Sequence, residues 1–226
     1  MAIREMQRWA ICSATGVRSN GAGYYRDFMD SSAWDERYAA TELVWSAGPN
    51  QFVEQELADL QPGRALDLAC GEGRNARWLA EGGWQVTAMD FSSVAVEKGR
   101  SLHDAVDWQV GDALTATLPR HLDLVVIAYL QVVAAERSVV MRRAFESLGL
   151  GGTLLVVAHD PTNLSDGTGG PQDPRVLYTA EDVLADLTGL KLEVVRAERV
   201  ARTVASPDSP EEERRAWDTL LRVVRS

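Results

Sequence analysis

The chain has 226 residues, 46% of them hydrophobic and 25% charged, which suits a single folded domain with a sizeable core. Its net charge of −10 disfavours nucleic-acid substrates and anionic membrane surfaces, because both are bound through basic patches. The sequence shows neither an apolar run of about 18 residues for a membrane span nor a signal peptide. We therefore expect a cytoplasmic protein. Cys12 and Cys70 make no zinc motif, and we predict no metal site.

The first 48 residues fall into two parts. We interpret residues 1–23 as a flexible extension and residues 24–226 as one domain. Within that domain, the segment 24–48 predicts a helix that begins near Ala33, capped by a preceding serine. Three large aromatic side chains of this segment either pack on the core or form a lid over a ligand site: Trp34, Tyr38 and Trp45.

A short apolar strand followed by a glycine-rich turn is the strongest local pattern. The apolar run ends at Leu68 with Asp67 beside it, and Gly71 and Gly73 follow before a helical pattern begins. Glycine adopts backbone angles that other residues avoid, and the free N–H groups at a helix start favour an anionic or strongly polar ligand. The order strand, turn, helix therefore predicts a site for a nucleotide-like cofactor.

Two cofactor classes suit this turn. The string from Gly71 to Ala76 fits G-x-G-x-x-A, the fingerprint of dinucleotide binding, which predicts NAD. Asp67 favours S-adenosylmethionine (SAM), because a carboxylate repels a pyrophosphate and attracts the ammonium group of the methionine half. The chain also lacks the Tyr-x-x-x-Lys pair of many hydride-transferring enzymes.

Two further acids follow predicted strands. Asp90 ends the second strand, about 20 residues after the glycine turn, where an acid reaches ribose hydroxyls. Phe91 comes next and can lie against an adenine ring. Asp112 follows the third strand. Because ligands of open α/β sheets bind at the carboxyl ends of the strands, we predict that Asp67, Asp90 and Asp112 share one ligand site.

The second half of the chain continues the α/β pattern. The run 123–130 is apolar throughout, which is typical of a central parallel strand buried on both faces. The next predicted strand ends at His159, which serves either as a general base or substrate contact, or as a hydrogen-bond partner of the following loop. The long loop 160–177 is of a kind that is often functional. The last run, which includes Trp217, alternates like a strand but also fits a helix.

The string DLACGEGRN resembles motif I of the class I SAM-dependent methyltransferases. The pattern WDERY, with a later tryptophan, resembles the N-terminal segment of small-molecule members of the tellurite/thiopurine type. Ala69 takes the first small position of the motif, and Asn75 replaces a glycine. The resemblance implies a Rossmann-like, doubly wound sheet of seven strands, mostly parallel with an antiparallel last strand. It adds these residues to the predicted SAM site: Ala69, Asn75, Phe91, Ala113 and Ala128.

The resemblance also implies methyl transfer from SAM to a small-molecule acceptor, with S-adenosylhomocysteine (SAH) as the product. In the family an acid at the place of Asp112 binds the adenine amino group. His159 and Tyr129 are the candidate catalytic residues, although a soft acceptor atom would need no base. The expected substrate or lid contacts are Trp34, Arg37, Tyr38, Trp45 and Gln131. The alternatives are an NAD-dependent oxidoreductase and a SAM-binding module without turnover.

Overall fold

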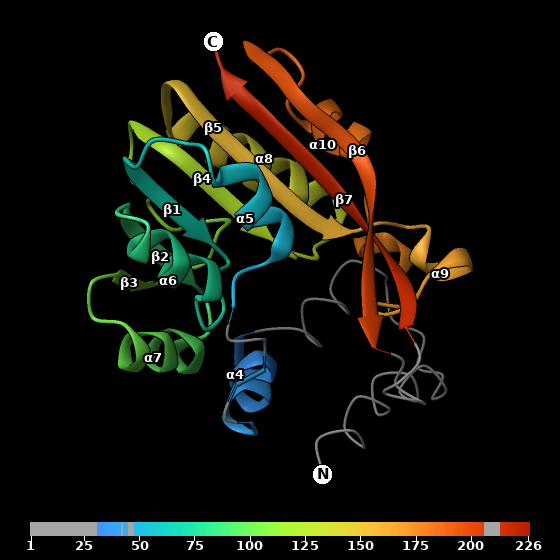
Figure 1. Ribbon diagram of the computed structural model, residues 1–226, viewed down its shortest axis with the longest axis horizontal. Helices are drawn as coiled ribbons and strands as arrows, with labels where there is room; N and C mark the ends of the chain where they lie inside the picture. The colour runs from blue at the N-terminus through green and yellow to red at the C-terminus, as the bar shows by residue number, and fades with distance from the viewer. Residues whose placement is uncertain (1–30, 42, 45–47, 206–212) are drawn as a thin grey trace.

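The computed structural model describes residues 31–41, 43–44, 48–205 and 213–226. The expected extension 1–23 and the lid candidate Trp45 lie outside these residues. Figure 1 shows a twisted central sheet with helices packed around it.

In the described part of the chain, seven strands form one sheet in the order β3-β2-β1-β4-β5-β7-β6. Neighbouring strands are parallel except at β7, which runs antiparallel to both β5 and β6. This arrangement confirms the expected doubly wound sheet with an antiparallel last strand. The strands are β1 (Arg64–Leu68), β2 (Gln85–Asp90), β3 (Asp107–Val110), β4 (Leu122–Ala128), β5 (Leu148–His159), β6 (Leu192–Ala205) and β7 (Glu213–Arg225).

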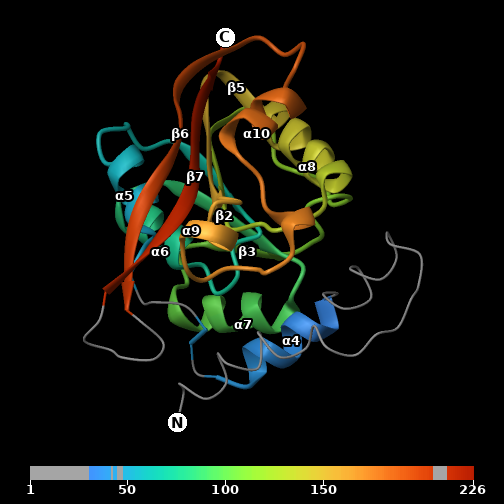
Figure 2. The same ribbon diagram turned by 90° about the vertical axis from the view of Figure 1, so that its right-hand side faces the viewer.

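Helices cover both faces of the sheet. Their bounds are α4 (Ser31–Ala39), α5 (Gln51–Leu57), α6 (Arg74–Glu81), α7 (Ser93–Leu102), α8 (Ala134–Ser147), α9 (Asn163–Asp166) and α10 (Ala180–Asp186). Helices α8 and α10 pack on one face, whereas α5, α6 and α7 contribute to the core of the other (Figure 2). The sheet and the helices on its two faces form a sandwich of three layers with two hydrophobic cores. Thr179 starts α10 with a reciprocal capping box to Asp182.

Strand β4 joins the two cores. Val125 and Ile127 face the core of α8 and α10, and Leu124 and Val126 face the other. The run is therefore buried on both faces, as its composition predicts. The strand ends at Ala128, two residues before the predicted end. The reason is that Tyr129 adopts a left-handed backbone with φ of 62°, so the chain turns away from the sheet after the Tyr129 N–H has bonded the carbonyl of Val157 on β5.

The C-terminal hairpin extends past the sheet. Pairing between β5 and β7 ends at His159 opposite Asp218, while β6 and β7 remain paired as far as Ala205 opposite Glu213. The hairpin therefore projects beyond the carboxyl edge of the parallel strands, beside α9 and on the side of the sheet where α4 lies (Figure 1). The last run of the chain forms strand β7, as its alternating pattern predicts, and not the helix that was the alternative.

The loop 160–177 is more ordered than its composition suggests, because it contains α9 and a 3-10 turn. The side chain of Asn163 mimics a strand partner of the hairpin. Its Nδ2 donates to the carbonyl of Trp217 at 2.6 Å, and its Oδ1 accepts from the Trp217 N–H at 2.7 Å. This pair of hydrogen bonds fixes the loop against β7.

Trp108 of β3 explains two glycines on neighbouring elements. A Cβ atom added to Gly73, before α6, or to Gly99, within α7, would lie 2.2 Å from the indole ring. The ring is nearly buried, and its Nε1 donates to the carbonyl of His103 at 2.9 Å. Gly73 is thus required by core packing as well as by its φ of 73°.

We expect Gly99→Ala to destabilise the protein. Alanine in a helix is normally favoured over glycine by about 1 kcal/mol, but here the added methyl group enters the Trp108 ring, and overpacking of this kind costs about 1–3 kcal/mol. Urea unfolding of Gly99→Ala, of Trp108→Leu and of the double variant measures the coupling between the two sites. If Gly99→Ala were more stable than the wild type, the clash with Trp108 would be contradicted. The same holds if the free energies of unfolding lost in the two single variants simply added up in the double variant.

Candidate active site

The carboxyl ends of β1, β2 and β3 bring the three predicted acids to one edge of the sheet. Asp67 and Asp90 are buried, with 1% and 5% of their surface exposed, whereas Asp112 is half-buried. The glycine turn lies between the first two acids, because Cys70 donates its N–H to the carbonyl of Met89 on β2. Two buried carboxylates beside one turn make this edge electrostatically costly unless a ligand or backbone groups satisfy them.

Asp67 performs a structural task with one oxygen only. Its Oδ2 accepts the N–H of Ala76 at 3.0 Å, and so caps α6, whose own N-cap residue Gly73 has no side chain to do so. The other oxygen, Oδ1, is buried and has no hydrogen-bond partner among the described residues. Burial raises the pKa of Asp67 to about 7. This oxygen is a ready acceptor for a cationic donor.

Asp90 organises the turn on the side of β2. Its Oδ2 accepts the N–H of Gly71 at 2.8 Å, and its Oδ1 accepts the N–H of Ser92 at 2.9 Å. A carboxylate offers about four lone-pair sites, so two remain for further donors such as hydroxyl groups. Burial raises the pKa of Asp90 to about 6, although the backbone N–H groups oppose this rise.

The turn itself is held in an unusual conformation. Ala69, Gly71 and Gly73 all have positive φ angles, of 59°, 56° and 73°. A positive φ at alanine is uncommon and strained, and such residues are typical of functional turns. The small residues Ala69 and Gly71 leave the backbone open to close approach by a ligand, whereas the Trp108 ring fills the space beside Gly73.

The remaining predicted cofactor contacts lie around this turn. Asp112 caps the segment after β3 through its Oδ1, which accepts the N–H of Leu114 at 2.8 Å. Phe91 follows β2, and Ala128 is the last residue of β4, which places both at the same edge. These residues are half-buried, as is Ala113.

Asn75 has a role that the sequence did not reveal. It is buried on α6, and its Oδ1 accepts the N–H of Asn50 at 2.9 Å. Asn50 in turn caps α5 through the N–H groups of Phe52 and Val53. The structure thus uses Asn75 to fix the start of α5 beside the glycine turn.

Helix α4 is tied to the same edge. Asp35 accepts hydrogen bonds from the hydroxyl of Ser92 at 2.5 Å and from the N–H of Val94 at 3.2 Å. In the glycine turn, the buried Glu72 accepts the N–H of Val44 at 2.9 Å and lies 3.4 Å from the ammonium group of Lys98. Helix α4 and Val44 are therefore anchored next to Asp90 and the turn.

The aromatic residues of α4 stack on one another. Trp34 and Tyr38 have ring centroids 5.6 Å apart, and the Arg37 guanidinium carbon lies 4.9 Å from the Trp34 ring. Tyr38 is buried, while Trp34 and Arg37 are half-buried. These contacts pack the residues of α4 against one another, and a role as a cover stays a prediction.

A second polar cluster forms where the hairpin meets the end of β4. The Tyr129 hydroxyl donates to Oδ2 of Asp218 at 2.9 Å and accepts from Nδ2 of Asn50 at 3.1 Å. Arg202 of β6 donates from Nε to the same Oδ2 at 2.6 Å. Burial alone would raise the pKa of Asp218, but His159 and Arg202 outweigh it and lower this pKa.

The two side chains of this cluster that β6 and β7 supply, Arg202 and Asp218, were not predicted as site residues. No local motif marks them, and only the antiparallel pairing of β7 with β5 brings Asp218 to His159.

Gln131, expected as a substrate contact, is engaged at both ends of its amide. Its Nε2 donates to the carbonyl of Val176 at 2.6 Å, and its Oε1 accepts the N–H of His159 at 3.1 Å. It therefore ties the end of β5 to the segment that precedes α10.

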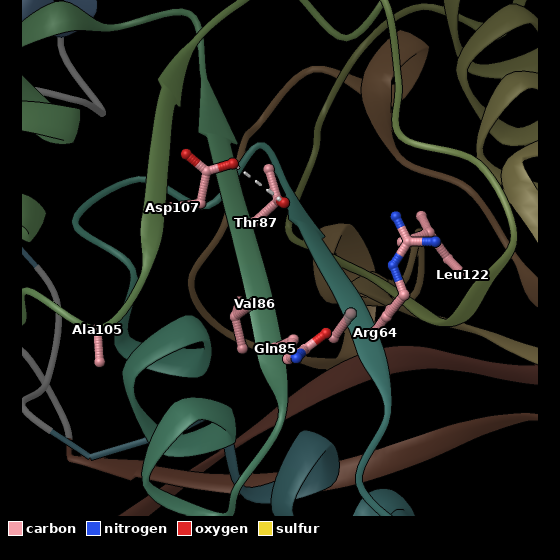
Figure 3. A pocket seen from close by; sticks show the side chains of 8 residues that line it. Arg64, Gln85, Val86, Thr87, Ala105, Asp107 and Leu122 are labelled. Carbon is pink, nitrogen blue, oxygen red and sulfur yellow. Dashed lines mark hydrogen bonds between the residues drawn. The ribbon is translucent and has the colours of Figure 1, made fainter.

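The opposite edge of the sheet carries a shallow pocket of about 300 Å³ (Figure 3). It is lined by residues at the starts of the strands, among them Arg64, Gln85 and Asp107. Asp107 faces Thr87, whose hydroxyl lies 3.4 Å from its carboxylate. This pocket has none of the buried acids, and ligands of such sheets bind at the carboxyl edge, so we place the site at the glycine turn.

None of the described helices is long and apolar enough to cross a membrane. Over the same residues, no group of three or more histidine, cysteine or acidic side chains is arranged to hold a metal ion.

Comparison with known proteins identifies the domain around the glycine turn. Residues 65–152 match the model of a methyltransferase domain family. A probable S-adenosylmethionine-dependent methyltransferase of Mycolicibacterium smegmatis is 28% identical over 144 residues, which cover 62% of this chain and 55% of that protein. The match thus spans little more than half of the relative's length.

Solved structures share the fold. TehB from Haemophilus influenzae superposes with a TM-score of 0.64 at 14% identity, covering 87% of this chain and 67% of that one. The N-methyltransferase NodS from Bradyrhizobium japonicum WM9, solved with SAH, gives 0.60 at 17% identity, covering 99% and 97%. The chain therefore carries a match to a methyltransferase domain family over residues 65–152, on a fold that it shares with known methyltransferases.

Proposed function

We propose that this protein transfers a methyl group from SAM to a small-molecule acceptor bound beyond the carboxyl edge of β4 and β5. The observation that carries the proposal is the buried Oδ1 of Asp67, which lacks a partner among the described residues and lies beside the glycine turn. A carboxylate in that place suits the ammonium group of SAM and would repel the pyrophosphate of NAD.

The residues of the edge fit SAM in chemical kind. Asp67 would hold the ammonium group, and the unused lone pairs of Asp90 would accept the ribose hydroxyls. Phe91, Asp112 and Ala113 would adjoin the adenine, and Ala69, Gly71 and Ala128 would leave room for the ligand, while Gly73 would start α6 beside it. Bound there, SAM supplies an electrophilic methyl group on a sulfonium. The protein supplies binding, orientation and exclusion of water.

Two features support a small acceptor. The segment 31–44 is hydrogen-bonded to Ser92, Val94 and the glycine turn, as a cover over the site would be, and Trp34, Arg37 and Tyr38 would form its aromatic part. The chain is also acidic overall, which disfavours nucleic acid as the acceptor. A cytoplasmic location stays a prediction from the sequence.

We expect Asp67→Asn to weaken binding of SAM and SAH without unfolding the protein. The amide oxygen can still cap α6, but the amide NH₂ would then face the ligand's ammonium group. Loss of a hydrogen bond between charged groups costs about 1.5–3 kcal/mol, or about 10- to 100-fold in Kd. Isothermal titration calorimetry measures the change.

The matched control is Asp107→Asn, which alters an exposed acid at the opposite edge of the sheet. It should bind like the wild type. Equal affinity of Asp67→Asn and wild type for SAM would contradict the assigned role of Asp67. A heat of binding measured with NAD but not with SAM would support the dinucleotide alternative.

We expect SAH to bind more tightly as the pH rises from about 5.5 to 7. The raised pKa of Asp67, about 7, leaves this carboxyl mostly protonated below that pH, so binding an ammonium group must release the proton. For a single group the affinity gain is roughly tenfold. The same raised pKa makes the unliganded fold less stable as the pH rises through this window.

Calorimetry of Asp67→Asn at the same pH values should show a flatter dependence, with a smaller residual slope from Asp90, whose pKa is also raised. A steep dependence that persists unchanged in Asp67→Asn would assign the titration to another group.

A further inference from the structure

We propose that Asp218 is a positioning residue that holds the imidazole of His159 with its Nε2 lone pair free, so that His159 accepts a proton from the methyl acceptor. The inference rests on the proposed methyltransferase function and deepens it by naming the substrate class. The reacting atom of the acceptor is an oxygen or nitrogen that carries a proton, rather than a soft atom that needs no base.

The pairing of β5 with β7 places the two side chains together. His159 and Asp218 lie directly opposite each other in the antiparallel ladder, and Nδ1 of His159 is 3.5 Å from Oδ1 of Asp218. This approach is too long to count as a formed hydrogen bond, and catalytic hydrogen bonds are often long in ligand-free sites. Nδ1 is buried and has no hydrogen-bond partner among the described residues, so the carboxylate of Asp218 is the acceptor toward which it can close. Because the carboxylate only accepts, the proton of the neutral imidazole belongs on Nδ1.

Two neighbouring side chains stabilise the ionised form of Asp218. It is fully buried, yet its pKa is lowered, because Arg202 and His159 favour the carboxylate over the acid. The charged groups around the imidazole are thus Asp218 of β7 and Arg202 of β6, with Arg74 of α6 next to the same cluster at 6.0 Å from the Tyr129 ring. Arg74 directly follows the glycine turn, so the cluster adjoins the proposed SAM site.

Tyr129, the other candidate base, is a positioning residue that supports Asp218. Its hydroxyl already donates to Asp218 and accepts from Asn50. Burial and the negative charge of Asp218 raise the pKa of this phenol, so it stays protonated. A phenol that keeps its proton for Asp218 cannot take one from an acceptor, and it acts instead as a positioning residue.

The imidazole ring is clamped between two neighbours. Its centroid lies 4.6 Å from that of the Tyr129 ring. In the loop 160–177, a Cβ atom at Gly170 would lie 2.7 Å from Cγ of His159. The ring plane is therefore fixed by contacts, and Asp218 selects which nitrogen carries the proton.

The proposed step balances as follows. A lone pair of the acceptor oxygen or nitrogen forms the bond to the methyl carbon, and the carbon–sulfur bond breaks with its electron pair on sulfur. The proton of the acceptor goes to Nε2 of His159. The products are the methylated acceptor, SAH and an imidazolium ion stabilised by Asp218.

The test is ¹⁵N NMR of the histidine side chains of the full chain at a pH where His159 is neutral. The protein has three histidines, so His159→Gln identifies the resonances of interest. We expect the Nδ1–H tautomer in the wild type. In Asp218→Asn, Arg202 and Tyr129 would retain the amide oxygen, the NH₂ group would face Nδ1, and the tautomer should reverse. An Nε2–H tautomer in the wild type, or no change in Asp218→Asn, would overturn the proposal.

Two controls separate this role from general damage. Asp160→Asn changes the buried acid next to His159, which bonds Thr162 and Thr219, and it should leave the tautomer unchanged. Gly170→Ala should shift the His159 resonances, whereas Gly169→Ala should not. Both glycines have a positive φ, of 76° and 79°, but a Cβ at Gly169 meets nothing within 4 Å.

The substrate class is read from SAH release with phenol, aniline and thiophenol, which present O–H, N–H and S–H on one ring. We expect turnover of the oxygen or nitrogen acceptor that falls at least about 100-fold in His159→Gln. Turnover of thiophenol alone, equal in wild type and His159→Gln, would overturn the assignment. Titration of the same samples with SAH tests the proposed function separately from the role of Asp218. Absence of SAH binding would refute the proposed function even if His159 has the expected tautomer.

Discussion

One half-satisfied carboxylate, that of Asp67, sets the constraint on which the site depends. Its Oδ2 replaces the missing side-chain cap of α6, and this bond fixes how the helix begins after the glycine turn. Its Oδ1 is buried without a partner among the described residues, a costly state for a carboxylate that either protonation, which the raised pKa of Asp67 favours, or a ligand can offset. Asp90 complements this arrangement from β2, because it binds the turn through Gly71 and keeps lone pairs for other donors.

The rest of the molecule supports this edge from three directions. Asn75 and Asn50 join α6 to α5, and Asn50 continues to the Tyr129 hydroxyl. Glu72 and Lys98 connect the turn to the segment 31–44. The hairpin of β6 and β7 brings Arg202 and Asp218 to the end of β5. The cofactor site that we propose at β1 and β2 is thereby linked, through a short chain of hydrogen bonds, to the proposed acceptor site at β4, β5 and β7.

What the sequence predicted and what it missed differ in physical kind. The apolar run of β4, the acids at the carboxyl ends of β1, β2 and β3, and the glycines of the turn are local signals, and local periodicity and spacing are enough to place them. Asp218 and Arg202 belong to the site only because antiparallel strands pair in one register, and no spacing along the chain encodes that pairing. Gly73 is a second case in which a contact between distant parts of the chain could not be predicted from the local sequence. Its position in the motif suggested room for a ligand, whereas the Trp108 ring from β3 occupies the place of its Cβ atom.

The division between local and long-range signals bears on specificity. A SAM site needs a turn, a helix start and acids at the ends of adjacent strands, all of which one short stretch of chain can supply. The acceptor site that we propose presents a proton acceptor and its partner to a small molecule, and those groups come from β5, β6 and β7 together. Because Tyr129, Arg202 and His159 all act on the single carboxylate of Asp218, a change in any of them alters the charge or the proton position at the others. In this fold, therefore, we expect acceptor specificity to depend on the C-terminal hairpin and the loop that packs on it, while the glycine turn stays committed to the cofactor.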